Sequence, residues 1–227
     1  MKRVIAIDGP SGAGKSSVSK NVGKQLGFKH VDSGALYRII TWQCLEKGID
    51  TSDPKAVAEF ARNVEVDVFP SEDAITYRVE GTDPGSRIRT PQINKHASPV
   101  ATVKEVRNIV TDLLRSMTQF GDIIVEGRDI TTAVFPNSPA RFYLDASPEA
   151  RAERRRREEL LKGIADQSLD DVRKSLLARD RIDSSRQHAP LRKADGALLI
   201  DSTKLTLEQV IETVISALPE DWKKESV

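Results

Sequence analysis

The sequence predicts an α/β fold built on a parallel sheet of five strands. Five short apolar runs, VIAI, KHV, IIV, FYL and LLI, are spread along the 227 residues and separated by segments with helical spacing. Continuous apolar runs are typical of strands buried on both faces. A glycine-rich turn directly follows the first run, as at the start of many α/β sheets. The length suits one domain.

The first part of the chain alternates between strands and helices. RVIAID is predicted to be the first strand, with residues 16–27 as the helix behind it. FKHVD follows as the second strand, and residues 33–48 as the second helix. A third helix is expected over residues 53–64, because Asp53 can cap it and Pro54 suits its first turn.

Residues 64–90 break this alternation. VEVDVF and ITYRVE alternate apolar and polar residues around the turn PSEDA, and a shorter RIRT follows the turn GTDPG. Such a period of two is typical of antiparallel strands with one exposed face. We expect a small antiparallel sheet here, with RIRT as its last piece, inserted into the α/β pattern.

The second half returns to helices and apolar strands. Residues 91–101 and 103–121 are predicted to be helical, and DIIVEG, RFYLDA and ALLIDS to be the last three strands. A highly charged stretch, residues 150–190, lies between the last two of these strands.

Composition limits the classes of function. Lys and Arg number 35 against 34 Asp and Glu, which argues against broad nucleic-acid binding. The single cysteine, Cys44, cannot form an internal disulfide and suits a helix in the core, so we expect a reducing compartment. The first apolar run is too short for a secretory signal, and no run approaches the roughly 18 apolar residues of a membrane span. We therefore expect a cytoplasmic protein that does not contact membranes.

The glycine-rich turn, GPSGAGKSS, contains the P-loop pattern G-x-x-x-x-G-K-[ST] between a strand and a helix. Its glycines let backbone N–H groups converge on phosphate oxygens, and the helix N-terminus adds partial positive charge. Lys15 is expected to reach the outer phosphates and the Ser16 hydroxyl to bind Mg²⁺. The predicted nucleotide-binding residues are Gly9, Pro10, Ser11, Gly12, Ala13, Gly14, Lys15, Ser16 and Ser17.

A P-loop alone leaves three classes of function open: a GTPase switch, an ATP-driven motor or regulator, and a kinase for a small acceptor. A GTPase needs N-K-x-D, but the single Asn-Lys pair continues as Asn94-Lys95-His96-Ala97, and no D-x-x-G occurs. A motor needs larger modules or oligomer-forming surfaces, which 227 residues do not obviously supply. These observations favour the kinase.

A kinase for an anionic acceptor needs positive charge away from the P-loop. Arg38 follows the second strand, Arg128 ends the third, and Arg179 and Arg186 lie in the charged stretch. The planar guanidinium group binds phosphate in a bidentate way and stays charged at any working pH. Ligands of open α/β sheets bind beyond the carboxyl ends of the strands, which favours Arg38 and Arg128 most.

Seven segments, in order over nearly the whole chain, resemble the bacterial cytidylate kinases within the P-loop nucleoside-monophosphate (NMP) kinases. They are IDGPSGAGKSS, VDSGALYR, RIRTPQINKHASPVA, EGRDITTAVFP, FYLDASPEARAERR, RDRIDSSRQHAPL and DSTKLTLEQVI. The resemblance implies a single three-layer P-loop domain over residues 1–227. Its core would be residues 1–63, 91–150 and 187–227, with an NMP-binding insertion at about 64–90 and an arginine-rich lid at about 151–186.

The resemblance also implies roles for individual residues. Lys15, Arg128 and Arg179 would be catalytic, and Arg154 in the lid would lie near ATP. Substrate binding would involve Ser33, Arg38, Ser98, Arg107, Arg128, Asp129, Arg179, Asp183 and Arg186. Within that set Asp129 would accept from the cytosine amine, Arg107 and Ser98 would donate to the ring, and Asp183 would accept from ribose. The arginines at 38, 128 and 179 would hold the acceptor phosphate, with Arg186 nearby, and Ser33 would contact the acceptor phosphate or ribose.

The implied reaction is ATP + CMP (or dCMP) to ADP + CDP (or dCDP), with no general base and no role for a histidine. Another small acceptor, such as UMP or shikimate with Asp32 as base, stays open as an alternative. A nucleotide-binding regulator without turnover is the second alternative. We expect a monomer whose partners are ATP, Mg²⁺ and CMP or dCMP.

Overall fold

The computed structural model describes residues 2–161, 163 and 168–223. Its main sheet has five parallel strands, as predicted, in the order β2-β5-β1-β6-β7. In that order the strands are β2 (Lys29–Asp32), β5 (Ile123–Gly127), β1 (Val4–Asp8), β6 (Ala140–Asp145) and β7 (Leu198–Asp201). The strand that leads into the P-loop is thus the central one.

Helices cover both faces of this sheet, which gives three layers. One face carries α2 (Ser33–Glu46), α3 (Pro54–Ala61) and α5 (Lys104–Ser116), and the other carries α1 (Lys15–Leu26) and α8 (Leu207–Ser216). Side chains of β1 alternate between the two layers: Val4 and Ala6 pack with the first set, Ile5 and Ile7 with the second. Cys44 is buried in α2, as expected.

The insertion holds a two-stranded antiparallel sheet, β3 (Asp67–Pro70) and β4 (Ile75–Arg78). The prediction that RIRT adds a strand is wrong, because residues 85–89 form a 3₁₀ turn, η1 (Gly85–Arg89). The Gly85 N–H bonds to Asp83 Oδ1 at 2.8 Å, and Pro84 has helical backbone angles. An Asp-Pro-Gly sequence thus starts a turn that the alternation of RIRT conceals.

Hydrogen bonds to backbone carbonyls fix the β3–β4 hairpin to the edge of the main sheet. Lys29 Nζ donates to the carbonyls of Ser71 and Glu72 at 2.7 and 3.1 Å, and the His30 N–H donates to the Asp73 carbonyl at 2.9 Å. The hairpin therefore lies beside β2, whose carboxyl end carries Asp32 and Ser33.

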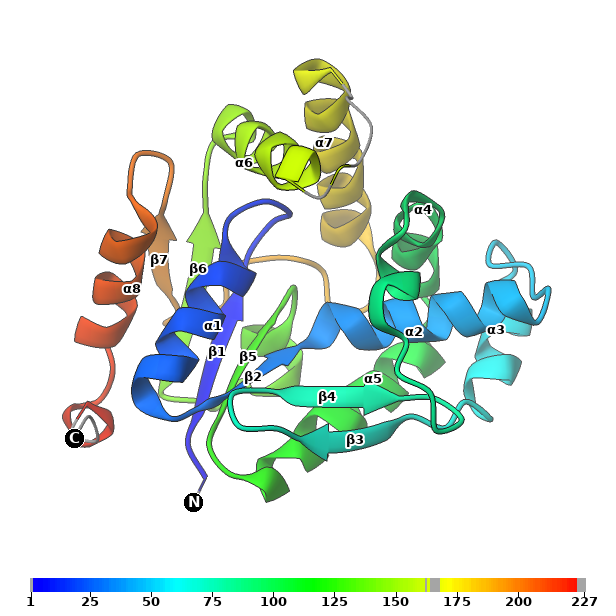
Figure 1. Cartoon of the computed structure of the whole chain (residues 1–227), viewed down its shortest axis with the longest axis horizontal. Coiled ribbons are helices and arrows are strands. Elements are labelled where there is room, and N and C mark those ends of the chain that lie inside the picture. The colour runs from blue at the N-terminus through cyan, green and yellow to red at the C-terminus, as the bar shows by residue number, and fades with distance from the viewer. Residues whose placement is uncertain (1, 162, 164–167, 224–227) are drawn as a thin grey trace.

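Further helices lie at the carboxyl ends of the strands. They are α4 (Pro91–Val100), α6 (Pro148–Leu161) and α7 (Leu169–Ser185). Figure 1 shows α6 above the end of β6, with α7 packed beside α6. The expected lid, residues 151–186, contains most of α6 and α7, while residues 162 and 164–167 lie outside the described part of the chain.

Three short turns complete the described secondary structure: η2 (Met117–Phe120), a π-helical turn η3 (Ile130–Val134) and η4 (Glu220–Trp222). The helix expected over residues 103–121 is thus α5 followed by η2. Within the described ranges, none of the helices has both the length and the apolar character that crossing a membrane requires.

Candidate active site

The P-loop, residues 9–17, turns from the end of β1 into α1. Gly9 has a φ of +150°, and a Cβ there would lie 1.9 Å from the Leu144 carbonyl oxygen of β6. Gly14, immediately before α1, has a φ of +95°. These positions require glycine, because a side chain would collide with β6 at the first and be strained at the second.

Lys15 is buried at the start of α1. Its Nζ donates to the Gly9 and Pro10 carbonyls, both at 2.8 Å, so the side chain folds back over the loop. Burial, and then the charge of Arg128, lower the pKa of Lys15 to about 7. The ammonium group is held over the loop that would cradle phosphates, where the nearby charges of Glu126, Asp8 and Asp180 only partly offset the cost of its burial.

The predicted metal ligand fits Mg²⁺ held mainly by phosphate. Ser16 and Ser17 are exposed in the first turn of α1, so the Ser16 hydroxyl is open to a metal ion. No group of three or more His, Cys, Asp or Glu side chains suited to a metal occurs among the described residues. Mg²⁺ commonly takes one or two protein ligands and fills its other positions with phosphate oxygens and water.

Arg128 connects the P-loop to α7. It directly follows β5, and its Nη2 donates to Ser11 Oγ at 2.7 Å. Its Nε donates to Asp183 Oδ2 at 2.9 Å. One guanidinium group thus contacts a residue predicted to bind nucleotide and a residue predicted to bind the acceptor.

A second group of charges lies at the end of β2. Arg38 Nη2 contacts Asp32 Oδ2 at 2.8 Å, and Arg89 Nη2 contacts the same oxygen at 3.0 Å. Burial acts to raise the pKa of Asp32, but the two arginines outweigh it and lower that pKa to about 2. Asp32 therefore does not suit the role of a general base. The neighbouring Ser33 is buried and donates to the Glu126 carbonyl at 2.6 Å.

Three of the predicted substrate-binding arginines keep a buried donor with no hydrogen-bond partner among the described residues. These donors are Arg38 Nε, Arg179 Nε and Arg186 Nη2. Burial and the nearby charge of Arg128 lower the pKa of Arg179 to about 10, which still leaves it charged at neutral pH. Arg38 Nε and Arg179 Nε are thus available to an anionic ligand within the described part of the chain, whereas Arg186 Nη2 forms an ion pair with Asp129.

Asp129 lies between two arginines. Arg107 Nη2 donates to Asp129 Oδ2, and both side chains are only 5% exposed. Arg186 Nη2 lies 3.5 Å from the other Asp129 oxygen, and Arg186 Nη1 lies 3.8 Å from Asp183. Ser98 is buried in α4, which packs against α2 and α7. The predicted base-reading pair, Arg107 and Asp129, is thus in direct contact.

We use the name charged cluster for the predicted acceptor residues that carry charge. They are Arg38, Arg107, Arg128, Asp129, Arg179, Asp183 and Arg186. They come from α2, α5, α7 and the segments that follow β5 and α7. Ion pairs link Arg107, Asp129, Arg186, Asp183 and Arg128 in a continuous chain.

Two residues that the sequence did not single out hold the P-loop to the helices above it. The buried Arg151 of α6 donates from Nη1 to the Ser11 carbonyl at 3.0 Å and to Asp180 Oδ2. Asp180 of α7 accepts from the Ser11 N–H at 3.0 Å. No local motif marks these contacts, because a run of arginines reads as a solvated helix face.

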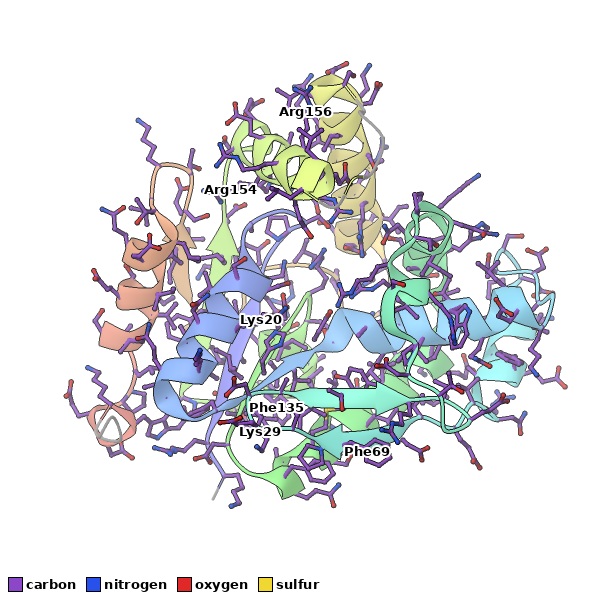
Figure 2. All side chains as sticks on the ribbon, in the orientation of Figure 1. Lys20, Lys29, Phe69, Phe135, Arg154 and Arg156 are labelled. Carbon is purple, nitrogen blue, oxygen red and sulfur yellow. The ribbon has the colours of Figure 1, made fainter. Side chains whose placement is uncertain are left out.

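The predicted ATP-binding arginine, Arg154, lies beside the P-loop. Figure 2 labels it on α6, and its Nη1 donates to Ser202 Oγ at 2.9 Å. Ser202 follows β7, and its Oγ donates in turn to the Ala13 carbonyl at 3.3 Å. By contrast, Arg155 pairs with Glu158 and Glu159 on its own helix.

A family model described as cytidylate kinase matches residues 5–220. The chain belongs to the cytidylate kinase family. A cytidylate kinase from Streptomyces avermitilis is 47% identical over 219 residues, which is 96% of this chain and 93% of that protein. A cytidylate kinase from Clostridioides difficile is 40% identical over 215 residues, or 95% of this chain and 97% of that protein. The predicted resemblance is therefore confirmed.

The fold is also similar to that of a more distant solved structure. A crystal structure of an uncharacterized protein from Eubacterium ventriosum has a TM-score of 0.50 at 10% identity, covering 95% of this chain and 97% of that one. At this identity the similarity concerns the fold alone. It agrees with the α/β architecture of this cytidylate kinase family member.

Proposed function

We propose that the protein transfers the γ-phosphoryl group of ATP to CMP or dCMP, which gives ADP and CDP or dCDP. The main observation in favour is the contact between Arg107 and Asp129, joined through Arg186, Asp183 and Arg128 to the P-loop. Membership of the cytidylate kinase family supports the same acceptor. The alternatives of a UMP or shikimate kinase and of a regulator have no comparable support.

In this proposal the P-loop amides and Lys15 bind the triphosphate, and Arg154 contacts ATP from α6. Mg²⁺, when bound with Ser16 as ligand, supplies neutralisation of phosphate charge. Arg38, Arg128 and Arg179 hold the acceptor phosphate, with Ser33 close by. The attacking phosphate oxygen is already anionic near neutral pH, so catalysis depends on positioning and charge stabilisation instead of a general base.

Recognition of the base depends on Asp129. Its carboxylate accepts from the exocyclic amine of cytosine, while Arg107 and Ser98 donate to the ring acceptors. Uracil presents a carbonyl at the position of the amine, so an oxygen of the buried Asp129 carboxylate faces a second acceptor in place of a donor, at a cost of about 1–3 kcal/mol. Asp183 accepts from ribose hydroxyls, and Arg186 lies between the two carboxylates.

The division of the single domain is part of the proposal. Residues 64–90 act as the NMP-binding insertion and residues 151–186 as a lid that excludes water from the transferring group. The contacts of Arg151 and Asp180 with Ser11 support the lid, since they join α6 and α7 to the P-loop. We further propose a cytoplasmic monomer.

The test is a panel of acceptors in an assay that couples ADP release to turnover. CMP, dCMP, UMP, AMP and shikimate are each supplied with ATP, with and without Mg²⁺. We expect fast turnover with CMP or dCMP, slower turnover with UMP, and none without Mg²⁺. Turnover with shikimate alone would identify the alternative kinase, and ATP binding with no acceptor-dependent turnover would identify the regulator.

A further inference from the structure

Asp8 is a fully buried carboxylate at the end of β1, directly before the P-loop. Its two oxygens accept three hydrogen bonds, from the Ile130 N–H at 2.8 Å, the Thr131 N–H at 2.7 Å and the Thr131 hydroxyl at 2.6 Å. All three donors belong to the first two residues of η3, which directly follow Arg128 and Asp129.

The local geometry explains why this segment needs an acceptor. Asp8 lies opposite Gly127 in the pairing of β1 with β5, so the chain leaves β5 beside the end of β1. Asp129 then has φ −146° and ψ 21°, outside the strand and helix regions, and offers no side-chain cap to η3. The free N–H groups at the start of a helical turn need a partner, and Asp8 supplies it from the neighbouring strand.

At position 8 an apolar side chain would be buried at a lower cost in free energy than a carboxylate. Ile5, Ala6 and Ile7, the residues before Asp8, are all fully buried and apolar. Desolvation makes an ionised carboxylate unfavourable in such a place unless specific hydrogen bonds offset it. Burial indeed raises the pKa of Asp8 to about 6, although the bonds from Thr131 and Ile130 act to lower it. A charge retained at this cost points to a role beyond packing.

We propose that Asp8 is a positioning residue for the acceptor nucleotide: its bonds to Ile130 and Thr131 fix the directions in which Arg128 and Asp129 point. Through this one side chain the strand that carries the P-loop also sets the acceptor site. The inference rests on the proposed function, because it gives Arg128 and Asp129 the roles stated there.

A competing explanation is that Asp8 only shapes the P-loop that follows it. The two explanations differ in the ligand they affect. If Asp8 shapes the loop, its replacement weakens ATP binding first. If Asp8 positions Arg128 and Asp129, its replacement weakens CMP binding and leaves ATP binding nearly intact.

The experiment compares Asp8→Asn with the wild-type protein. The amide keeps the size of the carboxylate but replaces one acceptor oxygen by a donor that faces N–H groups. Dissociation constants for CMP alone and for MgATP alone are measured by calorimetric titration, and kcat and KM by ADP release. We expect the CMP dissociation constant to rise about tenfold, as for loss of one buried hydrogen bond, and that for MgATP to change less than twofold.

Asp122→Asn is the matched control. Asp122 also joins β5 to β1, at the opposite end of the strands, through bonds from Arg3 N at 2.7 Å and Arg3 Nε at 2.8 Å. Its replacement removes a charge between the same two strands far from the P-loop. Both dissociation constants should stay at their wild-type values in this variant.

Thr131→Val tests the hydrogen bond between Thr131 and Asp8 from the side of the donor. It removes the hydroxyl donor while Asp8 stays in place, so the inference can be tested even if Asp8→Asn does not fold. We expect a smaller rise in the CMP dissociation constant for Thr131→Val than for Asp8→Asn. In the double variant the dissociation constant should rise by less than the product of the two single rises, because both changes remove the same bond.

The outcomes separate the inference from the proposed function. If wild-type protein does not phosphorylate CMP, both are overturned. If it does, equal weakening of ATP and CMP in the Asp8 and Thr131 variants overturns the inference alone, and so does an unchanged CMP constant. A CMP-selective loss in both variants, with Asp122→Asn unaffected, supports it.

Discussion

The candidate site has two halves, the P-loop and the charged cluster, and they are built to bind charged groups in different ways. The P-loop uses the backbone of nine consecutive residues, and its special positions are glycines such as Gly9 and Gly14. The charged cluster uses side chains from several helices and loops, linked by ion pairs. The P-loop is therefore built from one local stretch of sequence, whereas the charged cluster forms only when distant elements of the chain assemble.

The halves also differ in how firmly their charges are fixed. The pKa of Lys15 is lowered to about 7, so this charge can be lost near neutral pH. The arginines of the cluster stay charged, since even Arg179 has a pKa of about 10. The P-loop thus has an adjustable charge, and the cluster has permanent ones.

Replacement of Lys15 by alanine should have the largest effect. It removes the ammonium group that would stabilise the transferring phosphoryl group, so we expect kcat/KM for ATP to fall about 10³-fold. CMP binding, measured by calorimetric titration, should change little, because the hydrogen bonds of Lys15 go to the Gly9 and Pro10 carbonyls of the P-loop and not to the charged cluster.

Lys20→Ala is the control for this prediction. Lys20 belongs to the same helix, α1, but is exposed (Figure 2). Its replacement should leave kcat/KM within about twofold of wild type, as is usual for surface positions. A Lys15→Ala protein that keeps wild-type turnover would remove the P-loop lysine from the mechanism.

Replacement of Asp129 by asparagine should have an intermediate effect, confined to the acceptor. The amide can donate to the uracil carbonyl, where the carboxylate cannot. We expect the KM for CMP to rise about 10- to 100-fold, matching about 1–3 kcal/mol, and the preference for CMP over UMP to shrink at least tenfold. The KM for ATP should stay nearly constant. Steady-state kinetics with both acceptors measure these changes.

Asp170→Asn serves as the comparison for Asp129→Asn. Asp170 is an exposed acid of α7 that pairs with Arg173 and Lys174 on its own helix. Its loss should leave the CMP to UMP preference unchanged. Equal rises in the KM values for ATP and CMP in Asp129→Asn would contradict the base-reading role.

The same difference between the P-loop and the charged cluster explains which features could be predicted from the sequence. The P-loop was predictable because its pattern and its strand–helix context are local. The five strands were predictable from their short apolar runs, most clearly β1 and β5, which are buried along their whole length. Arg128 was predictable because it directly follows β5. In the charged cluster, Arg107, Asp129 and Asp183 followed only from the family resemblance, since their partners are far apart in the chain.

Contacts that depend on assembly were missed. The run from Arg151 to Arg157 is charged at nearly every position, so its pattern does not show which face is buried. Arg151 turns inward to Ser11, and Asp180 meets it from α7. Asp8 was equally hidden, because its partners lie 122 and 123 residues further on.

Proton uptake on ATP binding should be the smallest of the predicted effects. It should also distinguish the P-loop from the charged cluster most sharply. With a pKa of about 7, roughly nine-tenths of Lys15 is neutral at pH 8. Bound triphosphate favours the charged lysine, so its pKa rises and about one proton is taken up per ATP. ATP affinity should therefore weaken as pH rises above 7. Titration calorimetry in buffers of different ionisation enthalpy gives the proton number directly.

CMP supplies the opposite case in the same experiment. The arginines of the charged cluster are already protonated at pH 8, since the pKa of Arg179 is about 10, and the CMP phosphate is fully ionised. The binding enthalpy of CMP should then be independent of the buffer. Lys15→Arg, whose guanidinium does not titrate in this range, should abolish the uptake with ATP. If Lys15→Arg still takes up a proton on binding ATP, the proton goes to another group. That result would contradict the contrast between a titrating charge on Lys15 and permanent charges on the arginines of the charged cluster.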